Sequence, residues 1–295
     1  PIYFLSKVIS RLRIKNIIIE GNQLIASQQG QALLEFENTN LEIFGDMNLV
    51  KNNKGIKFLF LLRNCRSILE SIIFLENMSL GNDINFRAFF LESSIVSVYK
   101  NRLIHDFSRF GYLGFIFQLG GSMNLNDSSM ENCINKDLAC LVIESASIEI
   151  KFSIFRNSRG SRSGSLYTIL SDIKIFNSSF INGSSLYQQS GFTSFQESTR
   201  ISNALEINAL NRGLLSNSKI EINDSYFYAY FKGNPLVDFE GFNLANLEGN
   251  YFENKNLNDK IEGIVVFTST MIIKGTVFRN YKDEAGSAIK FIIID

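Results

Sequence analysis

The side chains in this sequence that could cleave a polysaccharide are its carboxylates and its one histidine. The single histidine, His105, is followed directly by Asp106, and Glu92 lies earlier in the same half of the chain. Hydrolysis of a glycosidic bond uses two carboxyl groups that flank the substrate. Consecutive residues on a strand point to opposite faces, so we expect His105 to lie in a loop. Because these three residues lie in the same half of the chain, a polysaccharide-processing site (lyase or hydrolase) near them is kept as an alternative hypothesis.

Other patterns that carry chemistry are missing from the sequence. Asp127 and Asp224 share a position in the repeat described below but lie well apart along it. Residues 160–164 (GSRSG) come closest to a serine nucleophile elbow, but Arg162 stands where the nucleophile would be. The sequence has no glycine-rich phosphate loop, and its cysteines lack metal-ligand spacing. We predict no catalytic residue, no cofactor and no metal.

Residues 226–231 (YFYAYF) are rich in aromatic side chains. Exposed aromatic faces suit pyranose rings, so a sugar-binding platform is one reading of this run. The other reading is structural, because Phe227 belongs to a core column while Tyr226 and Tyr228 flank it on the outward side of a strand. We favour the structural reading.

Modification is a further kind of chemistry that the sequence allows. Asn-x-Ser sequons begin at Asn77, Asn126, Asn177, Asn182 and Asn223. Asn126 and Asn223 are in phase with Lys151 and Lys274, on the outward side, where a glycan has room. Asn77 and Asn182 are predicted to be structural. The glycosylation candidates are therefore Asn126, Asn223 and Asn177.

The three cysteines leave the compartment open. Cys140 lies in an apolar run and is expected to be a buried small side chain. A disulfide between Cys133 and Cys140 is possible but is not supported by a recognised pattern. With Cys65 the count is odd, and three unpaired thiols would suit an intracellular protein.

The net charge is zero, so the sequence offers no electrostatic case for nucleic acid or an anionic membrane. No stretch approaches the 18 or so apolar residues of a membrane span. The chain begins at Pro1 and ends on a hydrophobic strand, 288–295. An uncapped strand edge invites pairing, so we expect an internal segment of a longer chain, or partner chains that cover its ends.

Asparagine recurs about every 25 residues along most of the chain, which indicates a solenoid. The regular members of this ladder are Asn132, Asn157, Asn182, Asn254 and Asn280, and the less regular ones are Asn22, Asn52, Asn77, Asn101 and Asn208, with Ala229 in a vacant position. Stacked amides can bond to one another along the axis, because each has donors and an acceptor. Asparagine also tolerates the left-handed backbone of a sharp corner.

Apolar columns keep the same phase as the ladder. Two residues before each asparagine stand Met130, Phe155, Phe180, Phe227, Phe252 and Phe278. Further columns of mainly isoleucine lie two residues apart, as in strands with one buried face. Short strands without helices between them predict a single all-β parallel β-helix over 1–295, with roughly eleven coils of about 25 residues. Coils are irregular in 1–120 and regular in 121–295.

The aromatic-x-Asn corner (Phe155-Arg-Asn157, Phe278-Arg-Asn280), followed by a small-residue–Ile strand (residues 285–289), resembles a known repeat. It is similar to the right-handed parallel β-helix of the pectin-lyase-like superfamily, and most of all to polymorphic outer-membrane adhesins and large protist surface proteins. The paired aspartates and basic motifs of that superfamily's enzymes are not matched. The resemblance therefore implies a right-handed coil and transfers no catalytic residue.

The sequence hypothesis is a non-catalytic rod of an extracellular or cell-surface protein that acts as a filament, spacer or adhesin. Its expected partners are other protein chains, through self-assembly or as neighbours in a filament, and glycans are a further candidate. Nucleic acid and membrane insertion are not expected. The alternatives are the enzyme with a site near His105 and an intracellular scaffold.

Overall fold

The structure is a computed structural model that describes most of the chain. The described residues are 2–22, 32–54, 58–77, 87–104, 114–133, 140–160, 164–185, 205–208, 216–229, 237–240, 242–254, 264–267, 270–281 and 288–292. His105, Asp106, Tyr230 and Phe231 lie outside them. Among the described residues, no helix has the length and apolar character to cross a membrane.

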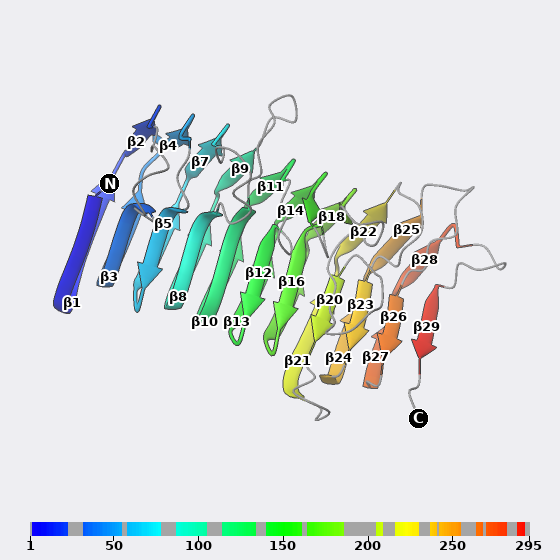
Figure 1. Ribbon diagram of the computed structural model, residues 1–295. Coiled ribbons are helices and arrows are strands. Elements are labelled where there is room, and N and C mark those ends of the chain that lie inside the picture. The colour runs from blue at the N-terminus through cyan, green and yellow to red at the C-terminus, as the bar shows by residue number, and fades with distance from the viewer. Residues whose placement is uncertain are drawn as a thin grey trace.

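The fold is an all-β parallel solenoid, as the sequence predicted. Two large sheets run along its length, and the chain advances from one end to the other (Figure 1). All pairings between the described strands of these sheets are parallel, for example β10 with β13 and β13 with β17. The predicted number of about eleven coils is not confirmed, because the described part of the second sheet contains ten strands.

The first sheet has seventeen strands. They are β1 (Ile2–Lys15), β3 (Ala32–Phe44), β5 (Phe58–Arg63), β6 (Arg66–Glu70), β8 (Arg87–Tyr99), β10 (Gly114–Asn126), β12 (Leu141–Glu144), β13 (Ser147–Lys151), β16 (Leu166–Ile169), β17 (Asp172–Phe176), β20 (Leu205–Asn208), β21 (Ser216–Asn223), β23 (Val237–Glu240), β24 (Phe242–Glu248), β26 (Ile264–Phe267), β27 (Thr270–Lys274) and β29 (Ile289–Ile292). A coil contributes to this sheet either one long bent strand or two shorter ones.

The second sheet is built from short strands. They are β2 (Ile18–Glu20), β4 (Asn48–Lys51), β7 (Ile72–Leu75), β9 (Arg102–Ile104), β11 (Ser129–Glu131), β14 (Ile154–Arg156), β18 (Ser179–Ile181), β22 (Tyr226–Ala229), β25 (Tyr251–Asn254) and β28 (Val277–Arg279). A separate pair consists of β15 (Arg159–Gly160) and β19 (Ser184–Ser185).

Three corners turn the chain, and in many of the described coils a corner uses a residue with left-handed backbone. The first corner bends the seventeen-stranded sheet at Asn38, Asn64, Ser93, Gly120, Ser145 and Leu170. The second corner joins the two sheets at Asn16, Gly45, Ser71, Lys100, Asp127, Phe152, Asn177, Asp224, Gly249 and Gly275. The third corner follows the ten-stranded sheet at Gly21, Asn52, Glu76, Asn132, Asn157, Asn182 and Asn280. Asparagine, aspartate and glycine tolerate this conformation best, which explains their recurrence.

The core consists of stacked columns that follow the predicted phase. Phe155 and Phe180 are fully buried, with ring centroids 4.7 Å apart and planes 3° apart. The stack continues through Phe227, Phe252 and Phe278 at 4.7–5.1 Å. These distances match the strand spacing of about 4.8 Å, so each ring lies directly above the next.

The structure places the predicted asparagines in different columns. Asn132, Asn157 and Asn182 share the third corner, where Asn157 Nδ2 donates to Asn132 Oδ1 (3.2 Å) and Asn182 Nδ2 to Asn157 Oδ1 (3.4 Å). Asn52, Ala229, Asn254 and Asn280 are in register with them. Two further asparagines, Asn22 and Asn77, lie one position later, on either side of Asn53, and the three form their own bonded stack.

Besides Asn22 and Asn77, two further predicted ladder positions are wrong. Asn101 lies at the second corner, directly before β9, where Ile72 N donates to its Oδ1. Asn208 lies in β20 of the seventeen-stranded sheet, opposite Glu240, and not at a corner. The intervals between asparagines are irregular in the first half and in the 183–213 region. They therefore did not show whether an asparagine lies at the third corner, at the second corner or in a strand.

A polar ladder at the second corner was not predicted. After seven of the ten left-handed residues of this corner comes a buried serine or asparagine, namely Asn48, Asn101, Ser128, Ser153, Ser178, Ser225 and Asn250. Ser128 N donates to Ser153 Oγ (3.3 Å) and Ser153 N to Ser178 Oγ (3.2 Å), so each side chain satisfies the amide of the preceding coil. This ladder connects most of the described coils.

Candidate functional site

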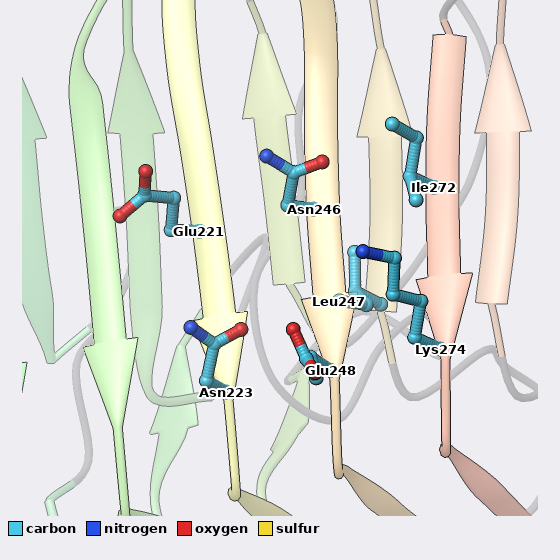
Figure 2. A pocket seen from close by; sticks show the side chains of 7 residues that line it. All are labelled: Glu221, Asn223, Asn246, Leu247, Glu248, Ile272 and Lys274. Carbon is cyan, nitrogen blue, oxygen red and sulfur yellow. The ribbon is translucent and has the colours of Figure 1, made fainter.

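A groove crosses the outward face of the seventeen-stranded sheet where β21, β24 and β27 lie side by side. Its volume is about 420 Å³, and its lining is mostly polar (Figure 2). The lining residues are Glu221, Asn223, Asn246, Leu247, Glu248, Ile272 and Lys274. The register sets them in two rows along the solenoid axis, Glu221–Asn246–Ile272 and Asn223–Glu248–Lys274. Neighbours in a row are one strand spacing apart, about 4.8 Å.

Differences in side-chain length explain why this face is hollow. Asn246 stands between Glu221 and Ile272, and it is shorter than both. In the second row Asn223 stands beside the longer Glu248. The short amides therefore lie low between taller neighbours. The buried Leu247, which faces the core, lies beneath them.

The charges of the groove nearly balance. Glu221 makes an ion pair with Lys174 of the adjacent strand β17, at 3.5 Å. Glu248 and Lys274 are register partners and are both exposed, yet neither forms an ion pair with a described residue. Two carboxylates and two ammonium groups thus meet at or beside the groove. Figure 2 shows the Asn246 amide and the Lys274 ammonium on the same side of the sheet.

The tyrosines at the start of the predicted aromatic cluster lie on the outward face of the ten-stranded sheet. Tyr226 stacks on Tyr251 with centroids 5.4 Å apart, and its hydroxyl donates to Glu253 Oε2 (2.8 Å). Burial, followed by this bond to the carboxylate, raises the pKa of Tyr226 far above its usual value. Arg279 Nη1 donates to the hydroxyl of Tyr251 (3.2 Å). The rings face each other along the axis, so this part of the cluster packs the sheet.

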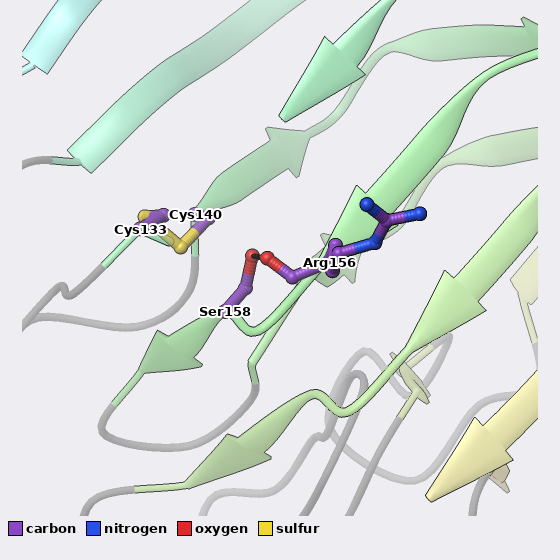
Figure 3. The surroundings of a disulfide bond; sticks show 4 residues. All are labelled: Cys133, Cys140, Arg156 and Ser158. Carbon is purple, nitrogen blue, oxygen red and sulfur yellow. Dashed lines mark hydrogen bonds between the residues drawn. A yellow bond between two sulfur atoms is a disulfide. The ribbon is translucent and has the colours of Figure 1, made fainter. Parts of the chain in front are cut away.

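Cys133 and Cys140 form a disulfide, with Cα atoms 6.0 Å apart and both residues fully buried (Figure 3). The bond ties the end of the third corner to the start of β12. Ser158, one coil further along, is also buried, and its hydroxyl donates to the Arg156 carbonyl (3.4 Å). The idea that all three cysteines are unpaired is therefore wrong, since only Cys65 is free.

The glycosylation candidates differ in exposure. Asn177 is exposed at the second corner and has a left-handed backbone (φ 47°). Asn126 and Asn223 are strand residues and are half-buried, with side-chain oxygens shielded from solvent. Asn177 thus presents the most accessible amide of the three. Asn77 is buried and Asn182 half-buried.

Of the three residues of the enzymatic alternative, only Glu92 lies in the described part of the structure. His105 and Asp106 lie outside the described residues, and the Glu92 carboxylate accepts from Arg63 Nε at 3.1 Å. Among the residues that the structure describes, no three His, Cys, Asp or Glu side chains are grouped closely enough to hold a metal ion.

Sequence reasoning missed the groove. Asn246 and Ile272 follow the charged residues Glu149, Lys174 and Glu221 in one outward column. The same column is also uncharged at Ile68, Ser97 and Asn124, so a loss of charge in it does not by itself mark the site.

Comparison with known proteins gives distant structural similarities. No family model matches the sequence, and no curated protein matches it. Among solved structures, the chain is similar to the Streptococcus pneumoniae surface protein and adhesin PfbA, with 11% identity, 99% of this chain and 91% of that chain covered, and a TM-score of 0.40. It is also similar to the A-module of the Azotobacter vinelandii mannuronan C-5 epimerase AlgE6, with 11% identity, 98% and 91% coverage, and a TM-score of 0.30.

Proposed function

We propose that this chain is a non-catalytic, right-handed β-helical rod of an extracellular or cell-surface protein, which acts as a structural spacer or an adhesin. The observation that carries the proposal is the continuity of the stacked columns. The second-corner ladder and the phenylalanine stack run from coil to coil without a break in register across β11, β14, β18, β22 and β25. Such a chain is stiff along its axis and exposes long, repetitive faces.

The disulfide supports a location outside the reducing cytosol. Disulfides persist in oxidising compartments and are rare where thiols are kept reduced. The Cys133–Cys140 bond is buried and closes a short segment. An intracellular scaffold with free thiols is correspondingly disfavoured.

The test is peptide mass spectrometry of the protein isolated from its native source, without reductant, combined with electron micrographs of the same material. We expect the Cys133–Cys140 bond to be intact, Asn177 to carry a glycan, and the particles to be straight rods. Free thiols at both cysteines together with no glycan would contradict the surface location. Round or flexible particles would contradict the rod.

A further inference from the structure

We propose that the groove over β21, β24 and β27 binds a neutral, hydroxyl-rich saccharide chain. This inference rests on the proposed surface role, because it names the ligand through which such a rod would adhere. It assigns binding, and no chemical step, to the groove.

The first argument is that polar groups in the groove are not used by the protein. Some acidic and basic side chains elsewhere on the outward faces pair, as in Lys151 with Glu149 (3.0 Å) and Lys174 with Glu221 (3.5 Å). In the groove, Asn246, Glu248 and Lys274 have no side-chain hydrogen bond or ion pair with a described residue. Polar groups that converge on a concave site without partners are the usual means of fixing a ligand.

The second argument is the mixture of donors and acceptors. The carboxylate of Glu248 only accepts, the ammonium of Lys274 only donates, and the amide of Asn246 does both. A sugar hydroxyl also donates and accepts, so adjacent hydroxyls can bond to all three groups. Ile272, which is 43% exposed at the edge, offers an apolar surface to the C–H face of a sugar ring.

The third argument concerns charge and size. Glu221 and Glu248 are balanced by Lys174 and Lys274, so the groove does not favour a polyanion such as a uronic-acid polymer. Its volume of about 420 Å³ lies within the range of small-molecule sites, about 300–1,000 Å³. The rows run along the axis, so a chain laid in the groove can continue over β17 past Phe176.

The experiment is isothermal titration calorimetry of the full chain with three probes: a glucose hexamer, a mannose hexamer and a galacturonate hexamer. We expect at least one neutral hexamer to bind, and to bind more tightly than the galacturonate. Asn246→Phe fills the hollow and should weaken binding at least about tenfold, while Lys274→Ala, which removes a charged hydrogen-bond donor, should weaken it more than about tenfold.

The matched control is Asn124→Phe. Asn124 is exposed, lies in the same outward column as Asn246, and is in register with it through Glu149, Lys174 and Glu221. The same substitution there should leave affinity unchanged, which separates a filled groove from a general effect of the ring. Thermal unfolding of each variant shows whether the fold is kept.

Three results of the titrations would overturn the proposal. They are no binding of either neutral hexamer, tighter binding of the galacturonate, or equal weakening by Asn124→Phe and Asn246→Phe. A glycan attached to Asn223 in the native protein would also overturn it, because that glycan would fill the groove. None of these results bears on whether the particles are rods, so failure of the ligand and failure of the rod are distinguishable.

Discussion

Phe152 has the left-handed backbone of the second corner, a conformation that asparagine and aspartate tolerate better than phenylalanine does. Its φ is 51°, and the ring is 57% exposed, so it gains little from burial. A non-glycine residue in the left-handed region costs roughly 1–2 kcal/mol, and asparagine tolerates it better. Adjacent coils hold Asp127 and Asn177 at this position.

We therefore expect Phe152→Asn to stabilise the chain by about 1 kcal/mol. Urea unfolding of both proteins measures the difference in free energy. The reciprocal change, Asn177→Phe, should destabilise by a similar amount. A loss of stability in Phe152→Asn would show that the exposed ring makes contacts that the backbone argument leaves out.

Cys65 occupies a corner position that other coils fill with small polar residues, such as Ser94. Ser94 Oγ accepts from the Cys65 amide (3.1 Å), and the Cys65 thiol donates to the Arg63 carbonyl (3.2 Å). Burial raises the pKa of the Cys65 thiol above its usual value. The unfolded chain therefore releases this proton at a lower pH than the folded chain does.

The sign follows from that difference in pKa. The folded state keeps its full advantage below the ordinary thiol pKa of about 8.5 and loses part of it as pH rises further. We expect wild-type stability to fall between about pH 7 and pH 10 more than that of Cys65→Ser, which has no thiol. Chemical denaturation at both pH values measures this. Parallel declines in the two proteins would mean that the pKa of the Cys65 thiol is the same in the folded and unfolded states.

At the scale of the elements, the second-corner ladder joins one coil to the next. Ser153 Oγ accepts from the Ser128 amide (3.3 Å) and donates to the Lys151 carbonyl (2.8 Å), and the residue is 1% exposed. Removing the hydroxyl leaves a buried amide without a partner. Ser153→Ala should cost about 1–3 kcal/mol.

Ser179→Ala is the control for this change. Ser179 starts β18, points outward and is half-buried, so its loss should cost roughly 0.5 kcal/mol or less. Differential scanning calorimetry compares the two variants. Equal effects would mean that the ladder is not a main source of cohesion between coils.

The sequence allowed the phenylalanine and isoleucine columns to be predicted, because their spacing from Met130 to Phe278 is 25 or 26 residues at every step but one, the 47 residues between Phe180 and Phe227. It did not separate the three corners. Asn101 and Asn157 are both asparagines at similar intervals, yet one accepts from a backbone amide and the other stacks on its own kind. Serine at 128, 153 and 178 repeats every 25 residues, so the ladder was visible in the sequence. The groove depends on the relative lengths of side chains on three adjacent strands. The period of the repeat gives no information about these lengths.

At the scale of the whole molecule, the disulfide limits how far the unfolded chain can expand. It joins residues seven apart in sequence. Closing so short a segment is worth about 2–3 kcal/mol by chain entropy. Replacing both Cys133 and Cys140 by serine should lower the free energy of unfolding by that amount.

The buried bond should also resist reductant in the folded state. We expect dithiothreitol to leave it intact until denaturant is added, as followed by thiol labelling. Rapid reduction without denaturant would show that this corner opens readily.

The unbroken register between coils also determines how the molecule responds to force. Each coil touches only its neighbours, so pulling on the two ends should peel coils off one at a time rather than rupture the whole at once. A coil of about 25 residues should release roughly 80–90 Å of contour, minus one strand spacing. The coil closed by Cys133 and Cys140 should release roughly 17–19 Å less, because the seven peptide units between them cannot extend and the disulfide spans only 6.0 Å between the two Cα atoms. A force trace would then carry one short step among equal ones, and that step would lengthen after reduction.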